Sequence, residues 1–292
     1  MDAEKTAFAK PMFSLEFFPP KSPEGIEKLG GVQRALRCLQ PAFCSVTFGA
    51  GGSTRQGTLD TVLGMKRDGV NAVPHLSCIG ATKAQIRDVI EQYRAHGIHH
   101  LVALRGDLPS GTFDGGAFRY AAELVAFIRD ISGDWFHIDV AAYPEVHPQA
   151  KSAEDDARYF KRKIDAGANS AITQYFYNAD AYWHFVDACA ALGVTAPVVP
   201  GIMPIWSYSR LSRFSEMCGA EIPRWIRRRM EGYGDDHTSV RAFGLDIVTD
   251  LCARLLERGA PGLHFYTLNQ SELTLEICRR LGLVAEMESS AV

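Results

Sequence analysis

One carboxylate stands inside an apolar run near the N-terminus, in the segment FSLEFFPP at residues 13–20. Side chains alternate along an extended strand, so Glu16 shares its face with Ser14 and Phe18. Burial among apolar groups disfavours the ionised form of a carboxyl, and Glu16 could therefore serve as a general acid. A structural alternative is a buried glutamate neutralised by an arginine from another strand, such as Arg105.

Polar residues also end most of the other apolar runs. They are Thr47, His75, Arg105 with Asp107, Tyr143 with Glu145 and His147, Gln174, and Asn269 with Gln270. A purely structural protein would not need this pattern, because a buried polar group costs free energy unless it is paired. Arg105 and Asp107 could orient a heterocycle through donor and acceptor groups, or form a structural salt bridge. His75 and His147 could also be satisfied core or loop histidines.

The runs that carry these residues are short and alternate with amphipathic stretches, which is typical of βα units. We expect strands at 12–18, 43–49, 71–78, 99–106, 136–144, 170–177, 196–205 and 262–269. Helices should start after Ser22, Thr82, Ser152 and Ser271, whose side chains suit an N-cap. These eight units predict a single α/β domain over 1–292, a (β/α)8 TIM barrel with its site at the carboxyl ends of the strands. A doubly wound sheet is the alternative.

The long segment 206–261 lies between the seventh and eighth predicted strands and contains two helical patterns, at 221–232 and 238–258. We interpret it as an extra helical insertion and not as a second domain. Its basic run, RWIRRR at 224–229, is typical of an exposed helix face or a subunit contact.

Composition excludes several classes of function. The chain has 31 Lys and Arg against 34 Asp and Glu, so no global positive field favours a nucleic acid or an anionic membrane. No signal peptide or long apolar run is seen, and we expect a cytoplasmic protein. Its 7 cysteines are scattered without a C-x-x-C pair and no H-E-x-x-H occurs, so neither a disulfide framework nor a metal is expected.

Two further motifs narrow the chemistry. The glycine-rich FGAGGST at 48–54 could cradle an anion, but it matches neither the dinucleotide-binding nor the P-loop pattern, and a tight turn explains it equally well. No predicted strand ends in a lysine that could form a Schiff base, which disfavours an aldolase.

Seven segments together resemble the methylenetetrahydrofolate reductase family. In chain order, over roughly residues 12–283, they are FSLEFFPPKSPEG, SVTFGAGGSTR, ALRGDLP, AAYPEVHPQA, KRKIDAGANSAITQYFYN, PGIMPI and HFYTLN. The resemblance implies a flavoprotein barrel that binds FAD non-covalently without a Rossmann unit. It also implies a ping-pong reaction in which NADH or NADPH reduces FAD, and the reduced flavin converts 5,10-methylenetetrahydrofolate to 5-methyltetrahydrofolate.

The resemblance also implies roles for individual residues. Glu16 matches the general acid that protonates N10 as the methylene bridge opens. Asp107 matches a carboxylate that holds the pterin beside the flavin, and Gln174 an amide that contacts folate and nicotinamide in turn. Phe214 falls where the family stacks an aromatic ring on either ligand. The implied flavin contacts are Thr47, Phe48, His75, Arg105, Gly106, Asp107, Ala121, Tyr143, His147, Ala150, Asp156, Arg162 and Lys163.

Two positions depart from the family pattern. Gln270 stands where arginine is usual, and Arg210 stands where glutamine is common. We hypothesise an exchange in which Arg210 recognises the benzoyl-glutamate tail of the substrate. The choice between NADH and NADPH is not determined by the sequence, because no ribose-reading residue can be identified.

The resemblance further implies a homo-oligomer that acts in one-carbon metabolism and methionine biosynthesis. It suggests a bacterial-type catalytic domain without the C-terminal S-adenosylmethionine-binding domain of eukaryotic relatives. Two other hypotheses remain open, a flavin-independent folate-binding barrel that acts as a lyase or methyltransferase, and a catalytically silent binding barrel.

Overall fold

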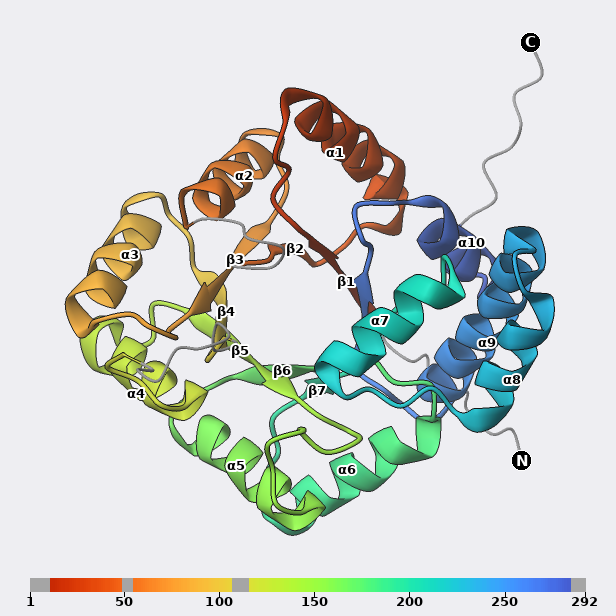
Figure 1. The fold of residues 1–292 in the computed structure, drawn as a ribbon. Helices are drawn as coiled ribbons and strands as arrows, with labels where there is room; N and C mark the ends of the chain where they lie inside the picture. The colour runs from red at the N-terminus through yellow and green to blue at the C-terminus, as the bar shows by residue number, and fades with distance from the viewer. Residues whose placement is uncertain (1–10, 49–54, 107–115, 285–292) are drawn as a thin grey trace, which may run out of the picture.

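Parallel strands form one sheet that curves into a nearly closed barrel with the helices outside it (Figure 1). The computed structural model describes residues 11–48, 55–106 and 116–284. Within these residues the strands are β1 Met12–Phe17, β2 Phe43–Val46, β3 Ala72–Ser77, β4 His100–Leu104, β5 His137–Ala142, β6 Ser170–Thr173, β7 Val198–Val199, β8 Gly201–Ile202 and β9 Gly262–Tyr266. Their order in the sheet is β7-β6-β5-β4-β3-β2-β1-β9-β8, and the predicted TIM-type barrel is confirmed.

The helices that surround the barrel follow the strands in turn. They are α1 Pro23–Leu36, α2 Arg55–Arg67, α3 Lys83–Ala95, α4 Ala121–Ser132, α5 Ala153–Asp165, α6 Ala179–Ala191, α7 Tyr208–Cys218, α8 Arg224–Tyr233, α9 His237–Glu257 and α10 Glu272–Arg280, with a 3-10 turn, η1, at Arg37–Leu39. Within the described residues, none of the helices has the length and apolarity needed to cross a membrane.

The predicted helix starts are confirmed. Ser22, Thr82 and Ser152 each accept a hydrogen bond from a backbone N–H in the first turn of the helix they precede. Ser271 also precedes its helix, α10, but its side chain makes no such bond. These caps satisfy backbone donors that have no partner within the helix, so they fix where α1, α3 and α5 begin.

The seventh predicted strand, 196–205, is split at Pro200 into β7 and β8. β7 pairs with β6, and β8 pairs with β9, so the two pieces occupy one position in the barrel. Proline has no backbone N–H to donate to a strand ladder, which explains the break. The carbonyl of Pro200 still accepts from the His264 N–H at 3.0 Å, and the sheet remains connected at this point.

Most strands end earlier than predicted. The run 170–177 is a strand only over Ser170–Thr173, and Tyr175, Phe176 and Tyr177 lie in the following loop. These three side chains are nevertheless buried, because the loop packs under neighbouring elements. Apolar composition therefore marks burial here and not strand. The polar residues predicted at strand ends consequently lie mainly in the loops just beyond the strands.

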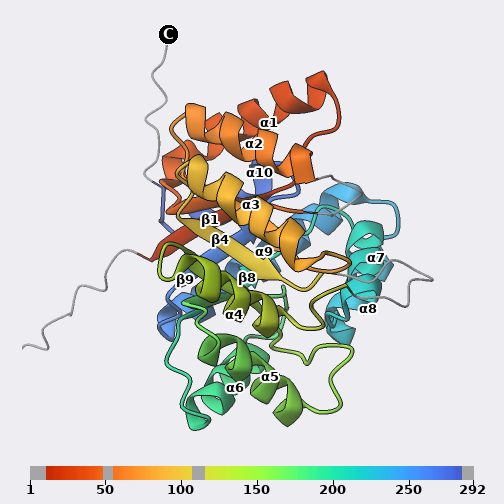
Figure 2. The same ribbon diagram turned by 90° about the vertical axis from the view of Figure 1, so that its left-hand side faces the viewer.

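The insertion between β8 and β9 contains α8 and α9, as predicted, together with α7, which precedes them. Figure 2 shows α7 and α8 at the end of the barrel toward which β4 points. In Figure 1, α7 lies across that end of the barrel. The insertion therefore contributes a wall to the face where a barrel enzyme has its site.

We expect Gly201→Ala to lower the free energy of unfolding by about 1–3 kcal/mol, because overpacking a tight contact forces a shift. A Cβ at this position would overlap the carbonyl oxygen of Thr173. Urea denaturation would measure the loss. The matched control is Gly232→Ala in α8, where nothing lies within 4 Å of the added Cβ, and this variant should be as stable as the wild type or slightly more so. Equal destabilisation of the two variants would contradict the packing argument.

Candidate active site

The side chain of Glu16 reaches histidines from two other strands. Its Oε2 atom lies 3.4 Å from Nε2 of His75 on β3 and 3.6 Å from Nε2 of His264 on β9. Ser14 holds the second histidine in place, since its Oγ lies 2.7 Å from Nδ1 of His264. Glu16 remains 18% exposed, whereas the His264 side chain is fully buried. The carboxylate is therefore held by buried groups and still open to a ligand.

The salt bridge with Arg105 that we considered for Glu16 is not observed. The Arg105 guanidinium donates to the carbonyl of Gly106 and to Oε1 of Gln149, at 3.1 and 2.7 Å. Burial lowers the pKa of His75, although the charge of Glu16 opposes this shift. The neutral imidazole is therefore the favoured form of His75, and its Nε2 lies near Glu16 without forming a hydrogen bond to it.

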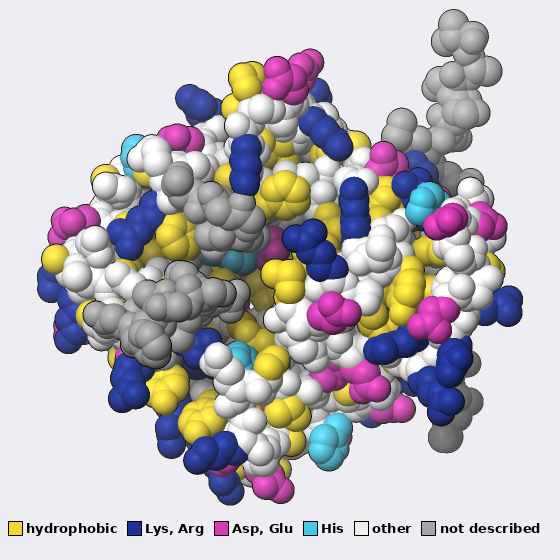
Figure 3. Space-filling view, viewed as in Figure 1, with side chains coloured by type: hydrophobic (Ala, Val, Ile, Leu, Met, Phe, Trp, Pro, Cys, Tyr) yellow, Lys and Arg dark blue, Asp and Glu magenta, His cyan; other side chains and the backbone are white. Residues whose placement is uncertain are grey.

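Several buried polar atoms near this carboxylate have no hydrogen-bond partner among the described residues. They are Ser45 Oγ, Thr47 Oγ1, His75 Nε2 and His264 Nε2. All four come from β2, β3 or β9, or from the residue directly after β2, and thus from strands close to β1. Buried polar groups are normally satisfied, so a set of open ones indicates a place where a bound molecule completes the hydrogen bonds. Figure 3 shows a hollow in this face of the molecule, with histidine and acidic side chains visible inside.

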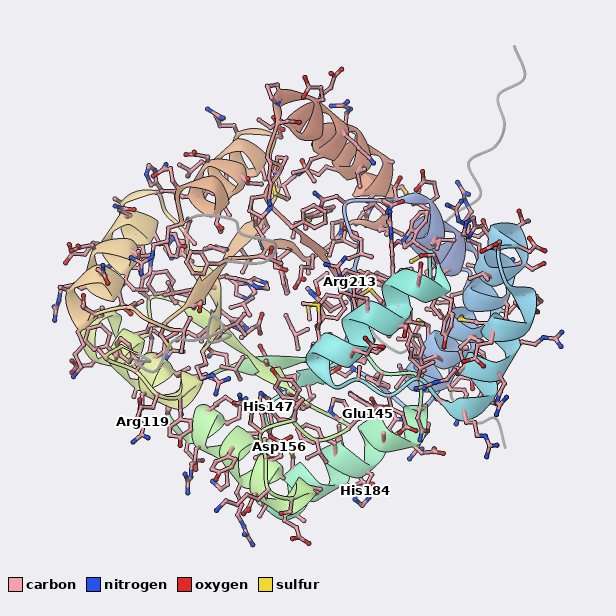
Figure 4. The ribbon with its side chains drawn as sticks, viewed as in Figure 1. Arg119, Glu145, His147, Asp156, His184 and Arg213 are labelled. Atoms are coloured by element: carbon pink, nitrogen blue, oxygen red, sulfur yellow. The ribbon has the colours of Figure 1, made fainter. Side chains whose placement is uncertain are left out.

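The loop after β5 is held by its own hydrogen bonds. The backbone N–H of His147 donates to Oδ2 of Asp156 at 2.8 Å, and the ring of His147 packs edge-on against Tyr143 at 4.5 Å. Ala150 donates its N–H to the carbonyl of His147. Figure 4 shows His147 and Asp156 close together between β5 and α5. Asp156 therefore positions this loop instead of pointing freely into the barrel mouth.

The two basic residues on α5 differ in placement. Lys163 donates to the carbonyl of Ala141 at 2.5 Å, and burial lowers its pKa to about 8. Arg162 is exposed, with its guanidinium 5.2 Å from the centre of the Tyr159 ring. The ammonium group of Lys163 is thus bound to the backbone of β5, whereas the guanidinium of Arg162 is accessible to solvent.

The remaining predicted flavin contacts fall as follows. Gly106 has φ +88 and lies so close to Ser77 that a side chain would clash, which explains the glycine. Phe48 is half-buried directly after Thr47, and Ala121 is the first residue of α4. Asp107 and residues 49–54 of the glycine-rich segment lie outside the described residues.

α7 is docked onto the carboxyl ends of β5 and β6. Glu145 accepts a hydrogen bond from the Glu221 N–H at 2.7 Å, just beyond α7. Tyr175, which follows Gln174, places its hydroxyl 3.0 Å from Oγ of Ser215 on α7. Gly219, the cap of α7, has φ +77 and packs against Pro148, so that a side chain there would overlap the proline ring. The insertion helix is therefore fixed to the same loops that carry the predicted site residues.

The three residues predicted to contact the substrate from α7 and from the position just after β6 differ in their exposure to solvent. Gln174 is half-buried, with Oε1 accepting from the Tyr175 N–H at 3.0 Å, and its amide NH2 is the group left to meet a ligand. Phe214 is half-buried and packs against the core. Arg210 is exposed at the start of α7.

A pocket of about 570 Å³ opens beside Arg210. It is lined by Lys28, Trp206, Ser207, Ser209, Arg210, His237, Arg241, Leu268 and Gln270. Among the described residues, no ion pair joins Arg210 or Lys28 to a carboxylate. The guanidinium of Arg241 lies 5.3 Å from the centre of the Trp206 ring. The structure thus brings Arg210 and Gln270, the two departures from the family pattern, into one cationic pocket.

Sequence reasoning missed His264, Glu145 as an anchor of α7, and the cations Lys28 and Arg241. His264 could have been found, since it shares a strand face with Tyr266 and pairs in register with Ser14. Asn269, considered at the strand end, is structural because its amide makes two hydrogen bonds with the backbone of Phe18. Lys28 and Arg241 come from helices distant in sequence, and no local pattern brings them together.

Comparison with known proteins identifies relatives along most of the chain. The family described as methylenetetrahydrofolate reductase matches residues 3–282. The 5,10-methylenetetrahydrofolate reductase of Salmonella typhimurium is 42% identical over 271 residues, which cover 92% of this chain and 90% of the relative. Methylenetetrahydrofolate reductase (NADH) 1 of Arabidopsis thaliana is 38% identical, over 95% of this chain and 49% of the relative.

One solved structure has a similar fold. It is a Clostridium thermocellum protein described as binding two copies of 5-methyl-5,6,7,8-tetrahydrofolic acid. The TM-score is 0.67 at 16% identity, and the alignment covers 93% of this chain and 94% of that one. At this level of identity the similarity concerns the fold alone.

We expect the stability of the protein to fall as pH rises from about 4.5 to about 7, owing to Glu145. Burial raises the pKa of this carboxyl to about 7 from 4.5, although the hydrogen bond from Glu221 opposes the shift. The folded protein therefore binds more protons than the unfolded chain in that window. Glu145→Gln keeps an acceptor for Glu221, and it should be more stable than the wild type at pH 8 by about 1–3 kcal/mol, since a tenfold difference in proton affinity corresponds to about 1.4 kcal/mol.

Urea denaturation at pH 5 and pH 8 measures this difference. Glu27→Gln, at an exposed position, is the control and should follow the wild type at both values. A Glu145→Gln variant with the same pH dependence as the wild type would contradict the assignment.

Proposed function

The chain belongs to the methylenetetrahydrofolate reductase family, and from that premise we propose that it reduces 5,10-methylenetetrahydrofolate to 5-methyltetrahydrofolate with bound FAD and a nicotinamide donor. The observation that carries the proposal is the Glu16 carboxylate, held between two buried histidines and still partly exposed. A general acid needs this combination of a fixed position and access to the substrate.

The residues present suit FAD. The open polar atoms Thr47 Oγ1 and His75 Nε2 belong to two residues that the family pattern assigns to the flavin. The other residues that the family pattern assigns to FAD are Phe48, Arg105, Gly106, Asp107, Ala121, Tyr143, His147, Ala150 and Arg162, together with Asp156 and Lys163, which bond to the neighbouring loop and strand and would act by positioning them. Bound FAD supplies hydride transfer between the nicotinamide and the folate. Arg162 and Arg105 would meet its pyrophosphate, because guanidinium groups donate paired hydrogen bonds to phosphate oxygens.

We propose that Glu16 holds the catalytic proton at its carboxyl oxygen and gives it to N10 of the folate as the methylene bridge opens. Ser14 fixes His264, and His264 and His75 in turn flank Oε2 of Glu16, which limits the motion of the acid. Asp107 would hold the pterin ring, and the free amide of Gln174 would contact the folate and the nicotinamide in turn. Phe214 on α7 would stack on either ligand.

The cationic pocket beside α7 suits the glutamate tail of the substrate. The glutamate of a folate carries two carboxylates. Arg210 and Gln270 both line the pocket, into which we propose the tail extends from the barrel mouth. A guanidinium binds a carboxylate more strongly than an amide does, because the hydrogen bonds are charge-assisted. We propose Arg210 as the main contact for the tail, with Gln270 beside it.

NADH is the donor to test first, because the Arabidopsis relative carries NADH in its name. The ping-pong order, the cytoplasmic location and a homo-oligomeric state belong to the same proposal. The exposed side chains of Met217 and Trp225, on α7 and α8, are apolar surface that a subunit contact would cover.

We expect Glu16→Gln to reduce the rate of folate reduction by about 10²–10⁴-fold, the usual contribution of a general acid. NADH should still bleach the flavin at close to the wild-type rate, because that half-reaction needs no proton at N10. Anaerobic stopped-flow absorbance, with NADH and then with methylenetetrahydrofolate, separates the two steps.

The matched control is the exposed Glu27→Gln, which should behave as the wild type in both half-reactions. A colourless protein that FAD cannot reconstitute would refute the flavin mechanism and favour a flavin-independent lyase or methyltransferase. If Glu16→Gln slowed flavin reduction and folate reduction equally, the acid role of Glu16 would be refuted, but the flavin mechanism would not.

We expect Arg210→Ala to raise the KM for methylenetetrahydrofolate about 10–100-fold with little change in kcat. The loss of a hydrogen bond to a charged group costs about 1.5–3 kcal/mol, and about 1.4 kcal/mol corresponds to a factor of ten. Steady-state kinetics at saturating NADH measure the effect. Arg224→Ala, an exposed arginine at the start of α8, is the control. An unchanged KM in Arg210→Ala would show that the tail binds elsewhere.

A further inference from the structure

A second polar cluster lies at the opposite end of the barrel, where β4, β5 and β6 begin. His100 and His137 are the first residues of β4 and β5 and are paired in register. Asp139, two residues after His137 on β5, is paired with Ser170, the first residue of β6. Nε2 of His100 lies 2.7 Å from Oδ2 of Asp139, and Nε2 of His137 lies 3.5 Å from Oδ1. His100, His137 and Ser170 are the first residues of their strands, whereas Glu16 is the next-to-last residue of β1.

The carboxylate in this cluster is a buried charge that the proposed reaction does not use. Asp139 is only 3% exposed. A carboxylate in a barrel interior is costly unless it is paired, and here its side-chain partners among the described residues are the imidazoles of His100 and His137 and the hydroxyl of Ser170.

We infer that His100, His137 and Asp139 form a binding site for one divalent transition-metal ion of the Zn²⁺ class. Two imidazoles and a carboxylate are a usual ligand set for such an ion. One ligand atom from each of the three residues lies within 4.8 Å of the others. An ion at about 2.0–2.1 Å from each ligand sets tetrahedral ligand atoms about 3.3 Å apart. The two histidines now approach different oxygens of Asp139, His100 at 2.7 Å from Oδ2 and His137 at 3.5 Å from Oδ1, so the ion would replace the present hydrogen bond of His100 as the side chains adjust.

The surroundings hold the ligands and leave a path to solvent. Ser170 donates its hydroxyl hydrogen to Oδ1 of Asp139 and so orients the carboxylate, and its oxygen can accept from Nε2 of His137 at 2.7 Å, a hydrogen bond that a metal bound to this nitrogen would replace. The ring of Phe43 packs edge-on against His100 with centroids 4.6 Å apart. The His137 side chain is 48% exposed, which gives the ion access and room for water as a fourth ligand.

The bound ion would connect β4 to β5 at the floor of the barrel. Each of these strands contributes a ligand from its first residue, so the ion would add a link between two strands that are joined at this end by backbone hydrogen bonds and by the His100–Asp139 contact. We therefore expect the ion to act mainly on stability, since two of its ligands begin their strands and the mouth loops follow the strand ends.

The test uses the full chain without a histidine tag, freed of metal with EDTA. Zn²⁺ is titrated calorimetrically, Co²⁺ binding is followed by its visible absorption, and the melting temperature is measured with and without Zn²⁺. We expect one ion per chain and a higher melting temperature with Zn²⁺. His137→Ala, at a half-exposed position, should weaken binding at least tenfold and abolish the rise in melting temperature.

The matched control is His99→Ala. His99 precedes His100 but stacks on Trp135 at 4.3 Å and is absent from the ligand set, so this variant should bind metal as the wild type does. Asp139→Asn supplies a second variant with the same volume and should also lose the ion. The inference is overturned if the wild type binds no ion, or if His137→Ala and His99→Ala bind equally well. Neither outcome depends on reductase activity.

Discussion

Side chains alternate between the two faces of each strand in a parallel barrel, and the core and the candidate site of this protein both depend on that constraint. Once β1 pairs with β2 on one side and β9 on the other, every second residue must face the barrel interior. Phe13, Leu15 and Phe17 then pack in the main core, while Glu16 reaches His75 and His264. A shift of one residue in register would expose the apolar face and bury a different set. The position of the acid is thus fixed by backbone pairing.

The same rule creates two polar clusters with different chemistry. Near the carboxyl end, the Nε2 atoms of His75 and His264 have no hydrogen-bond partner among the described residues, so this cluster is open to a ligand. Where β4 and β5 begin, the hydrogen-bonding groups around Asp139 satisfy one another, and the proposed metal would replace some of these bonds. The two proposed sites, one reactive and one stabilising, would thus lie at different levels of the same strands.

The insertion helix α7 links the barrel to its substrate side. Glu145, Tyr175 and Gly219 tie this helix to the loops after β5 and β6, and the helix carries Arg210 and Phe214. Because these contacts are made by loop residues, any movement of α7 would also move the loop that holds His147. Under the roles proposed for Arg210, Phe214 and His147, substrate recognition and the flavin contacts would be coupled through this docking surface.

The sequence alone determined the barrel class and the helix starts, because these follow from local periodicity and capping residues. It also singled out Glu16 as the one carboxylate in an apolar run. The motif resemblance also identified the family. Only the tertiary structure decided which side chains meet. It places His264 and not Arg105 beside Glu16. It also gathers Lys28 and Arg241 around the pocket of Arg210, and two histidines around Asp139. It also decided the break at Pro200. Such contacts join residues far apart in the chain, and only closure of the sheet brings them within reach.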